Sequence, residues 1–124
     1  MEKFGENEVL YTKLAYVYHV NGDYKQAETL YQKAMKINST YSDPHNNMAY
    51  IELMHKNNKL EAMRYAKNAV EYSPGNPNFL DTLGIVYMAM NEYQKAQEVF
   101  QQAVAISPNN AEFQQNLEKA ERAQ

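Results

Sequence analysis

The sequence repeats a pattern of small and aromatic residues at an interval close to 34. Three alanines, Ala27, Ala62 and Ala96, are separated by 35 and then 34 residues. Two further sets keep the same separations: Tyr31, Ala66 and Phe100, and Ala34, Ala69 and Ala103. An upstream set of neighbouring pairs is separated by 34 and then 35 residues: Leu14 and Ala15, Met48 and Ala49, Leu83 and Gly84. Such a period indicates a linear array of like units rather than one closed core.

Each unit is predicted to consist of two amphipathic helices, as the third unit illustrates. One stripe of its first helix has spacings of three, one and three residues: Leu80, Leu83, Gly84 and Tyr87. After a polar turn at residues 91 and 92, a second stripe has spacings of three, four and three: Tyr93, Ala96, Phe100 and Ala103. Pro108 ends this helix, since proline has no N–H to donate. We therefore expect a helical hairpin in which Gly84 and Ala96 allow close approach beside the larger side chains.

These residues resemble the tetratricopeptide repeat family, whose pattern is an aromatic residue, Leu-Gly, Tyr, Ala, an aromatic residue, Ala and Pro. The third unit matches most fully, and the first has Ser39 where proline is usual. The second unit departs from the pattern at three positions where bulky apolar groups are expected: His45, Glu52 and Ala66. The resemblance implies an all-α fold, a right-handed α-α superhelix of three helix hairpins.

We expect a flexible lead-in at residues 1–7, repeats at 8–41, 42–76 and 77–110, and a capping helix at 111–124. The seven expected helices span roughly 8–21, 23–38, 43–56, 60–72, 77–90, 92–106 and 110–122, with no strand. The last helix begins like a fourth unit at Leu117, but Glu118 stands where a small residue should admit a partner helix. Its apolar residues Phe113, Leu117 and Ala120 favour a helix that covers the end of the third unit.

The second unit contains one extra residue between Ala49 and Ala62, because the separations change from 34 to 35 there. A longer polar turn at residues 55–59 would accommodate it at little cost. The alternative is a bulge inside the helix, which would rotate Leu53 into the core and free Glu52 from it. The cost of burying the Glu52 carboxylate unpaired is an argument for the bulge. We nevertheless predict the longer turn, with Glu52 reaching solvent or a neighbouring cation.

Composition and charge argue against several classes of function. The 124 residues carry 12 basic and 15 acidic side chains, a net charge of −3, which disfavours nucleic acid as a partner. No apolar run approaches the ~18 residues that span a bilayer, so we expect no membrane insertion. The N-terminal MEKFGENE lacks the apolar core of a signal peptide. The cytoplasm is the default expectation, although the sequence does not determine the compartment.

The sequence also lacks the patterns that catalysis requires. There is no cysteine, and the four glycines stand alone, so neither thiol chemistry nor a glycine-rich phosphate loop is available. His45 and His55 lie about 15 Å apart along one helix, too far to share a metal. We expect no enzyme activity, no cofactor and no metal.

The first helix of each unit carries a further stripe that does not face its partner helix. In tetratricopeptide proteins these helices line the concave face, so the resemblance implies a groove for an extended peptide or a partner helix. The predicted groove residues are Thr12, Lys13, Tyr16 and His19 in the first unit, Asn46, Asn47, Tyr50 and Leu53 in the second, and Asp81, Thr82, Ile85 and Met88 in the third. Alternatively, the apolar residues of this set pack between neighbouring units. For Leu53 and Met88 the two interpretations have equal weight. We favour the groove for Tyr16 and Tyr50, because tyrosine suits a half-exposed contact.

A subset of the family grips acidic C-terminal tails of heat-shock chaperones through a carboxylate clamp of two lysines, two asparagines and an arginine. The corresponding residues here are Thr12, Tyr16, Asn47, Asn78 and Thr82. Only Asn47 agrees, so we reject the clamp. The ionic groups of the face nearly cancel, with Lys13 and Lys119 against Asp81 and Glu112.

We therefore predict a non-enzymatic interaction module, an adaptor or scaffold, whose groove binds a protein or peptide partner through apolar anchors. The alternative is a structural subunit that self-associates into a homo-oligomer, through an uncapped N-terminal helix or by one molecule's tail entering another's groove.

Overall fold

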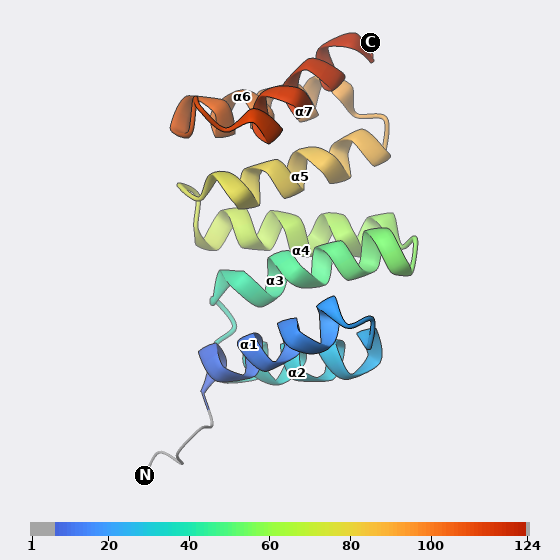
Figure 1. Ribbon diagram of the computed structural model, residues 1–124, viewed down its shortest axis with the longest axis vertical. Coiled ribbons are helices and arrows are strands. Elements are labelled where there is room, and N and C mark those ends of the chain that lie inside the picture. Colours follow the sequence, from blue (N-terminus) through green and yellow to red (C-terminus); the bar gives the residue numbers. More distant parts are fainter. Residues whose placement is uncertain (1–6, 124) are drawn as a thin grey trace.

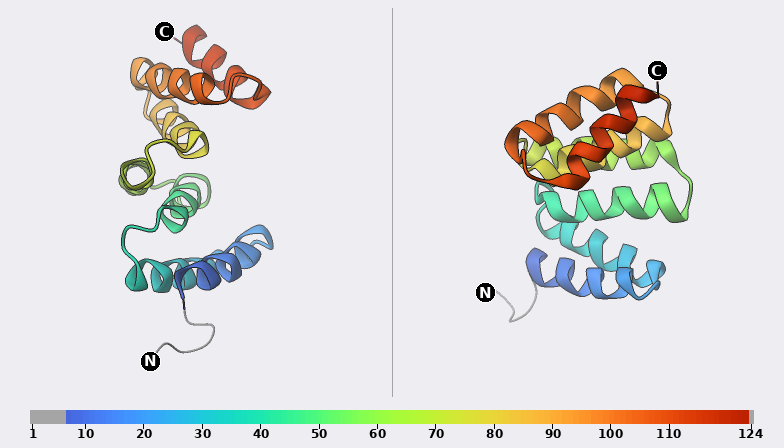
Figure 2. Two further views of the ribbon diagram at one scale, coloured as in Figure 1. Left: turned by 90° about the vertical axis from the view of Figure 1, so that its left-hand side faces the viewer. Right: turned by 45° about the horizontal axis from the view of Figure 1, so that its top comes forward.

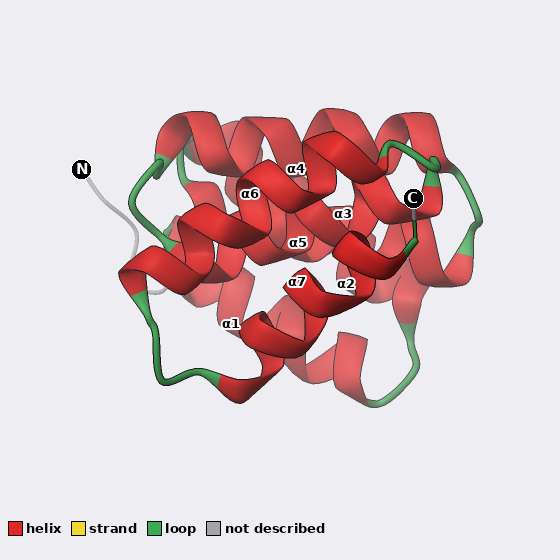
Figure 3. Ribbon diagram, turned by 90° about the horizontal axis from the view of Figure 1, so that it is seen from above, coloured by secondary structure: helices red, strands yellow, loops and turns green. Residues whose placement is uncertain are grey.

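The computed structural model describes residues 7–123, and all regular structure in this range is helical (Figure 3). The elements are α1 Glu8–Val20, α2 Tyr24–Ile37, α3 Ser42–Tyr50, the π-helical segment η1 Ile51–His55, α4 Lys59–Tyr72, α5 Pro77–Ala89, α6 Tyr93–Ile106 and α7 Ala111–Arg122. The expected all-α solenoid with its seven helices is confirmed, α3 and η1 together forming the third. The predicted lead-in lies outside the described residues apart from Asn7.

Successive helices pack as antiparallel hairpins, which stack into an elongated molecule with α1 and α2 at one end and α7 at the other (Figures 1 and 2). Each hairpin turn holds one residue in the left-handed region: Gly22, Asn57 and Asn91. Asparagine side chains cap several helices; the Oδ1 atom of Asn110, for example, accepts a hydrogen bond of 3.0 Å from the backbone N–H of Phe113.

The hairpins close through small residues, as the sequence predicts. Ala15, Ala49, Ala62 and Ala96 are fully buried. In the third hairpin, a methyl group added to Gly84 would overlap the ring of Phe100, so only glycine admits the two helices at this distance.

The prediction of a longer turn in the second unit is wrong. The three hairpin turns have equal length, at residues 21–23, 56–58 and 90–92, and the extra residue lies inside the helix as η1. The backbone N–H of Lys56 donates to the carbonyl of Ile51 at 3.2 Å, the five-residue step of a π-turn. This wide turn keeps the capped start of α4 unchanged and lets Leu53 pack against the core.

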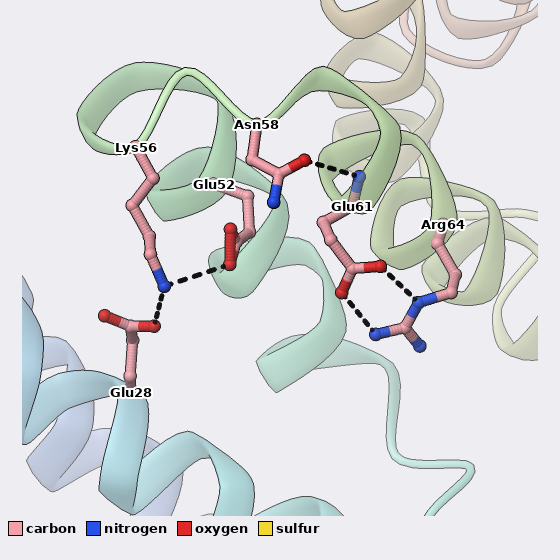
Figure 4. A network of polar contacts seen from close by, with 6 residues as sticks. All are labelled: Glu28, Glu52, Lys56, Asn58, Glu61 and Arg64. Atoms are coloured by element: carbon pink, nitrogen blue, oxygen red, sulfur yellow. Dashed lines mark hydrogen bonds and ion pairs between the residues drawn. The ribbon is translucent and has the colours of Figure 1, made fainter.

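Glu52 is not freed by the bulge, since it stays only 5% exposed. It does find the cation that we expected: its Oε1 lies 3.3 Å from Nζ of Lys56, which also bonds Oε1 of Glu28 at 2.8 Å (Figure 4). The other oxygen, Oε2, is buried and has no hydrogen-bond partner among the described residues. The second unit thus accepts an incompletely paired carboxylate at its irregular turn.

The last helix, α7, packs on α6 and α5. Phe113 and Ala120 are buried there, with Leu117 partly buried beside them. No helix in residues 7–123 has the length and apolar character needed to cross a membrane.

Candidate binding groove

A hollow of about 520 Å³ lies where α1, α3 and the start of α5 meet. Its lining comes from three successive units: Thr12, Lys13, Tyr16, Tyr41, Asp43, Asn46, Asn47, Asn76, Asn78 and Phe79. Five predicted groove residues are brought together here, Thr12, Lys13, Tyr16, Asn46 and Asn47. We call this region the main hollow.

The predicted set of groove residues omits five residues of the main hollow: Tyr41, Asp43, Asn76, Asn78 and Phe79. They lie in the connections before α3 and α5 or in the first turn of those helices, whereas the prediction followed the helix stripes alone. The signal that was available is positional: the residues that lead into the first helix of a unit border the same face as its stripe.

The main hollow combines apolar and polar side chains and is almost uncharged. Its charged side chains are one cation, Lys13, and one anion, Asp43. The carboxylate of Asp43 accepts a 2.9 Å hydrogen bond from the hydroxyl of Tyr41, and burial, assisted by this bond, raises the pKa of Tyr41 to about 12. Four asparagine amides, each able to donate and accept, supply most of its remaining polarity.

A smaller hollow of about 160 Å³ lies between α5 and the end of the molecule, lined by Ile85, Met88, Phe100, Asn116 and Lys119. Two predicted groove residues, Ile85 and Met88, border it. Asp81 is buried nearby, and its Oδ1 accepts a 2.9 Å hydrogen bond from Nδ2 of Asn116. Burial raises the pKa of Asp81, and the negative charge of Glu112 adds to the effect.

The remaining predicted residues line neither hollow. Thr82 is 2% exposed and donates its hydroxyl to the carbonyl of Asn78 at 3.0 Å. Tyr50 is half-buried, and burial raises its pKa against the opposing effect of a hydrogen bond with Thr82. Leu53 packs against the core, as the alternative interpretation allowed.

His19 also lies outside both hollows, in an aromatic cluster at the turn end of the first hairpin. Its Nδ1 is 3.2 Å from the hydroxyl oxygen of Tyr31, and its ring contacts those of Tyr16, Tyr24 and His55 edge-on. Burial lowers the pKa of His19, helped by the neighbouring His55. Within the described residues, no three potential ligands gather as a metal site would require.

The sequence pattern of the tetratricopeptide repeat matches this chain twice, at residues 9–41 and at residues 53–120. The second match alone covers more than half of the chain. The chain belongs to the tetratricopeptide repeat family. Residues 42–52, between the two matches, comprise α3 and the first two residues of η1. They include His45 and Glu52, two of the positions at which this tetratricopeptide array departs from the family pattern.

Relatives and solved structures agree with this assignment. The photosystem I assembly protein Ycf3 of Rippkaea orientalis is 26% identical, over 79% of this chain and 70% of that protein. The BBSome complex member BBS4 of Bos taurus is 40% identical over 50 residues, 40% of this chain but only 10% of that protein. The first tetratricopeptide domain of Spaghetti (RPAP3), solved bound to the HSP90 peptide SRMEEVD, superposes with a TM-score of 0.88 at 18% identity, covering 96% of this chain and 94% of that one.

Proposed function

We propose that this chain is a non-enzymatic protein-interaction module, an adaptor or scaffold, that holds an extended peptide or a partner helix in the main hollow. The observation that carries the proposal is the lining of that hollow, which combines four asparagine amides with the rings of Tyr16, Tyr41 and Phe79 from three units. Asparagine amides suit the N–H and C=O groups of an extended chain, and the accessible rings of Tyr16 and Tyr41 suit apolar anchors.

A structural neighbour also supports a peptide ligand. The structurally similar first domain of Spaghetti is bound to a peptide, and four of our clamp-equivalent residues line the main hollow here: Thr12, Tyr16, Asn47 and Asn78. The chemistry differs, however, because Lys13 is the hollow's only cation and the fifth equivalent, Thr82, is buried. We therefore propose a ligand with apolar or aromatic anchors rather than an acidic tail.

A near-neutral groove also determines how binding responds to salt. Association that depends on charge weakens as salt screens the ion pairs. With one lysine and one aspartate in the main hollow, binding should change little between low and moderate salt. The same balance supports a protein or peptide partner over nucleic acid.

The test begins with peptides selected from a random display library on the intact chain. Their affinities are then measured by fluorescence anisotropy for wild type, Tyr16→Ala and Asn47→Ala, with SRMEEVD as the acidic comparison. Leu60→Ala is the matched control, because Leu60 is an exposed apolar residue on α4 outside both hollows. We expect the two groove variants to weaken binding by about 1–2 kcal/mol each, the control to bind normally, and SRMEEVD to bind more weakly than the selected peptides.

The opposite pattern would exclude the groove. If affinity collapses at moderate salt while Tyr16→Ala binds normally, the ligand is held elsewhere by charge. We rest the test on Tyr16 rather than Tyr50, because Tyr50 does not line the main hollow and its loss would also disturb Thr82.

Self-association is the second candidate function. The version in which one molecule's tail enters another's groove has no specific support in the geometry. The version through the N-terminal helix is favoured by one observation, the exposed apolar face of α1.

A further inference from the structure

The outermost helix at the N-terminal end of the stack presents an apolar stripe to solvent. Leu10, Leu14 and Val17 follow one another at spacings of four and three on α1, and they are 45%, 46% and 52% exposed. Val20, one turn further, is also exposed. We call Leu10, Leu14, Val17 and Val20 the α1 end face; the end of the stack that it occupies is visible in Figure 2.

Equivalent positions in the other two units are buried. The residues that correspond to Leu10, Leu14 and Val17 are Pro44, Met48 and Ile51 in the second unit, and Phe79, Leu83 and Val86 in the third. None of these six is more than 6% exposed, because each set packs against the preceding hairpin. The α1 end face therefore has the composition of a surface that is covered by another helix wherever a preceding unit exists.

The opposite end of the molecule does not offer a surface to match. The exposed residues of α7 are almost all polar or charged: Ala111, Glu112, Gln114, Gln115, Glu118, Lys119, Glu121 and Arg122. An apolar stripe gains nothing by replacing water with such a surface. A head-to-tail chain of copies is therefore disfavoured. Most of the large apolar side chains exposed within residues 7–123 belong to α1, so an identical end face offers the best apolar match.

We propose that the α1 end face binds the α1 end face of a second copy, as an antiparallel helix pair about a two-fold axis. The stripe itself carries no charge, so self-pairing places no like charges within it. Antiparallel pairing also sets the amino end of each α1 beside the carboxyl end of the other, so that ends of opposite partial charge lie next to each other.

The size of the face limits the strength of the dimer. A 13-residue helix is about 20 Å long and 10 Å wide. The area that one face of it can bury is therefore smaller than the ~800 Å² per partner of a standard stable interface. The pair should therefore form at high micromolar concentration. This inference does not depend on the proposed peptide site, and the two fail separately, because neither Leu14 nor Val17 lines the main hollow.

The test is a concentration series of the full chain by sedimentation equilibrium, from about 10 µM to about 1 mM, a range that brackets a weak dimer. The wild-type mass should rise from 14.4 kDa toward twice that value. Leu14→Glu should remain monomeric throughout. Leu60→Glu, which adds the same charge at a 74% exposed leucine on α4, should dimerise like wild type. A wild type that stays monomeric at the highest concentration, or a Leu14→Glu variant that dimerises normally, overturns the proposal.

A second measurement needs no variant, and so stands even if Leu14→Glu folds poorly. In ¹H–¹⁵N spectra of the wild type across the same concentrations, the amide signals of Leu10, Leu14 and Val17 should move together while those of α7 stay fixed. Movement of α7 signals instead would indicate head-to-tail contact, and would overturn the two-fold pairing.

Discussion

The second and third hairpins reach the same architecture with different interiors. In the third, α5 is a regular helix in which Gly84 accepts the ring of Phe100. In the second, Ala49 and Ala66 occupy the corresponding positions, and the first helix carries an extra residue in η1. Their turns nevertheless have the same length and the same left-handed asparagine. The turn and the close helix contact are therefore the elements that both hairpins keep, while the regularity of the first helix differs between them.

The largest difference between the two hairpins is expected when one residue is deleted from the first helix of each. Deleting Glu52 removes the extra residue, brings Leu53 to a spacing of 34 from Tyr18, and leaves no need for a wide turn. Deleting Val86 rotates the rest of the regular helix α5 by about 100° and displaces Tyr87 from the core. We expect the free energy of unfolding of the Glu52 deletion to lie within about 1 kcal/mol of the wild-type value, and the Val86 deletion to be largely unfolded. Circular dichroism during urea titration measures both. Equal damage from both deletions would show that η1 is not where the chain absorbs its extra residue.

A smaller effect is expected when the third hairpin is given the interior of the second. Gly84→Ala should destabilise the chain by about 1–3 kcal/mol through overlap with Phe100, although alanine favours the helix by about 1 kcal/mol. In a Phe100→Ala background the overlap is absent, so the same substitution should stabilise. The four chains of this cycle are compared by urea unfolding. The same sign of effect in both backgrounds would mean that the Gly84–Phe100 contact does not set the helix separation.

The smallest effect concerns a charge that the two hairpins do not share. Asp81 corresponds to Asn46 in the second hairpin, and burial raises the pKa of Asp81 above its ordinary value of 3.8. A carboxyl group whose pKa is raised by folding destabilises the folded state when ionised, so its cost is present at neutral pH and disappears as the pH falls through the folded pKa toward 3.8.

Asp81→Asn should therefore be slightly more stable than wild type at pH 7, and the difference should shrink on acidification. Thermal melts of the two chains between pH 7 and pH 4 measure it, and because the other carboxyl groups are common to both chains their titration largely cancels. A difference that grows as the pH falls would mean that Asp81 is stabilised, not penalised, in its ionised form.

The sequence predicted the helices and the hairpin contacts because each rests on a local rule: stripes at helical spacing, a residue that breaks a helix, and small residues at a fixed period. It misplaced the extra residue, because counting the period locates an insertion only between Ala49 and Ala62. Whether a turn or a helix absorbs it depends on the packing of Leu53 and the pairing of Glu52 with Lys56, which are tertiary contacts.

The candidate groove also contains residues that the sequence predicted and residues that depend on tertiary packing. Helical phase placed Thr12, Tyr16 and Asn47 on one surface, and the structure brings them together. Helical phase alone did not predict that the Thr82 side chain is buried. Nor did it bring in Tyr41 and the other residues ahead of α3 and α5, because their position depends on how successive units are stacked.

The most direct test of the account is to map which atoms a selected peptide touches, by ¹H–¹⁵N spectra of the intact chain during titration. A ligand in the main hollow should cause the largest shifts at the backbone amide of Tyr16 and at the side-chain amides of Asn47 and Asn78. Shifts confined to α2, α4 and α6, with these three signals unchanged, would contradict a ligand site in the main hollow.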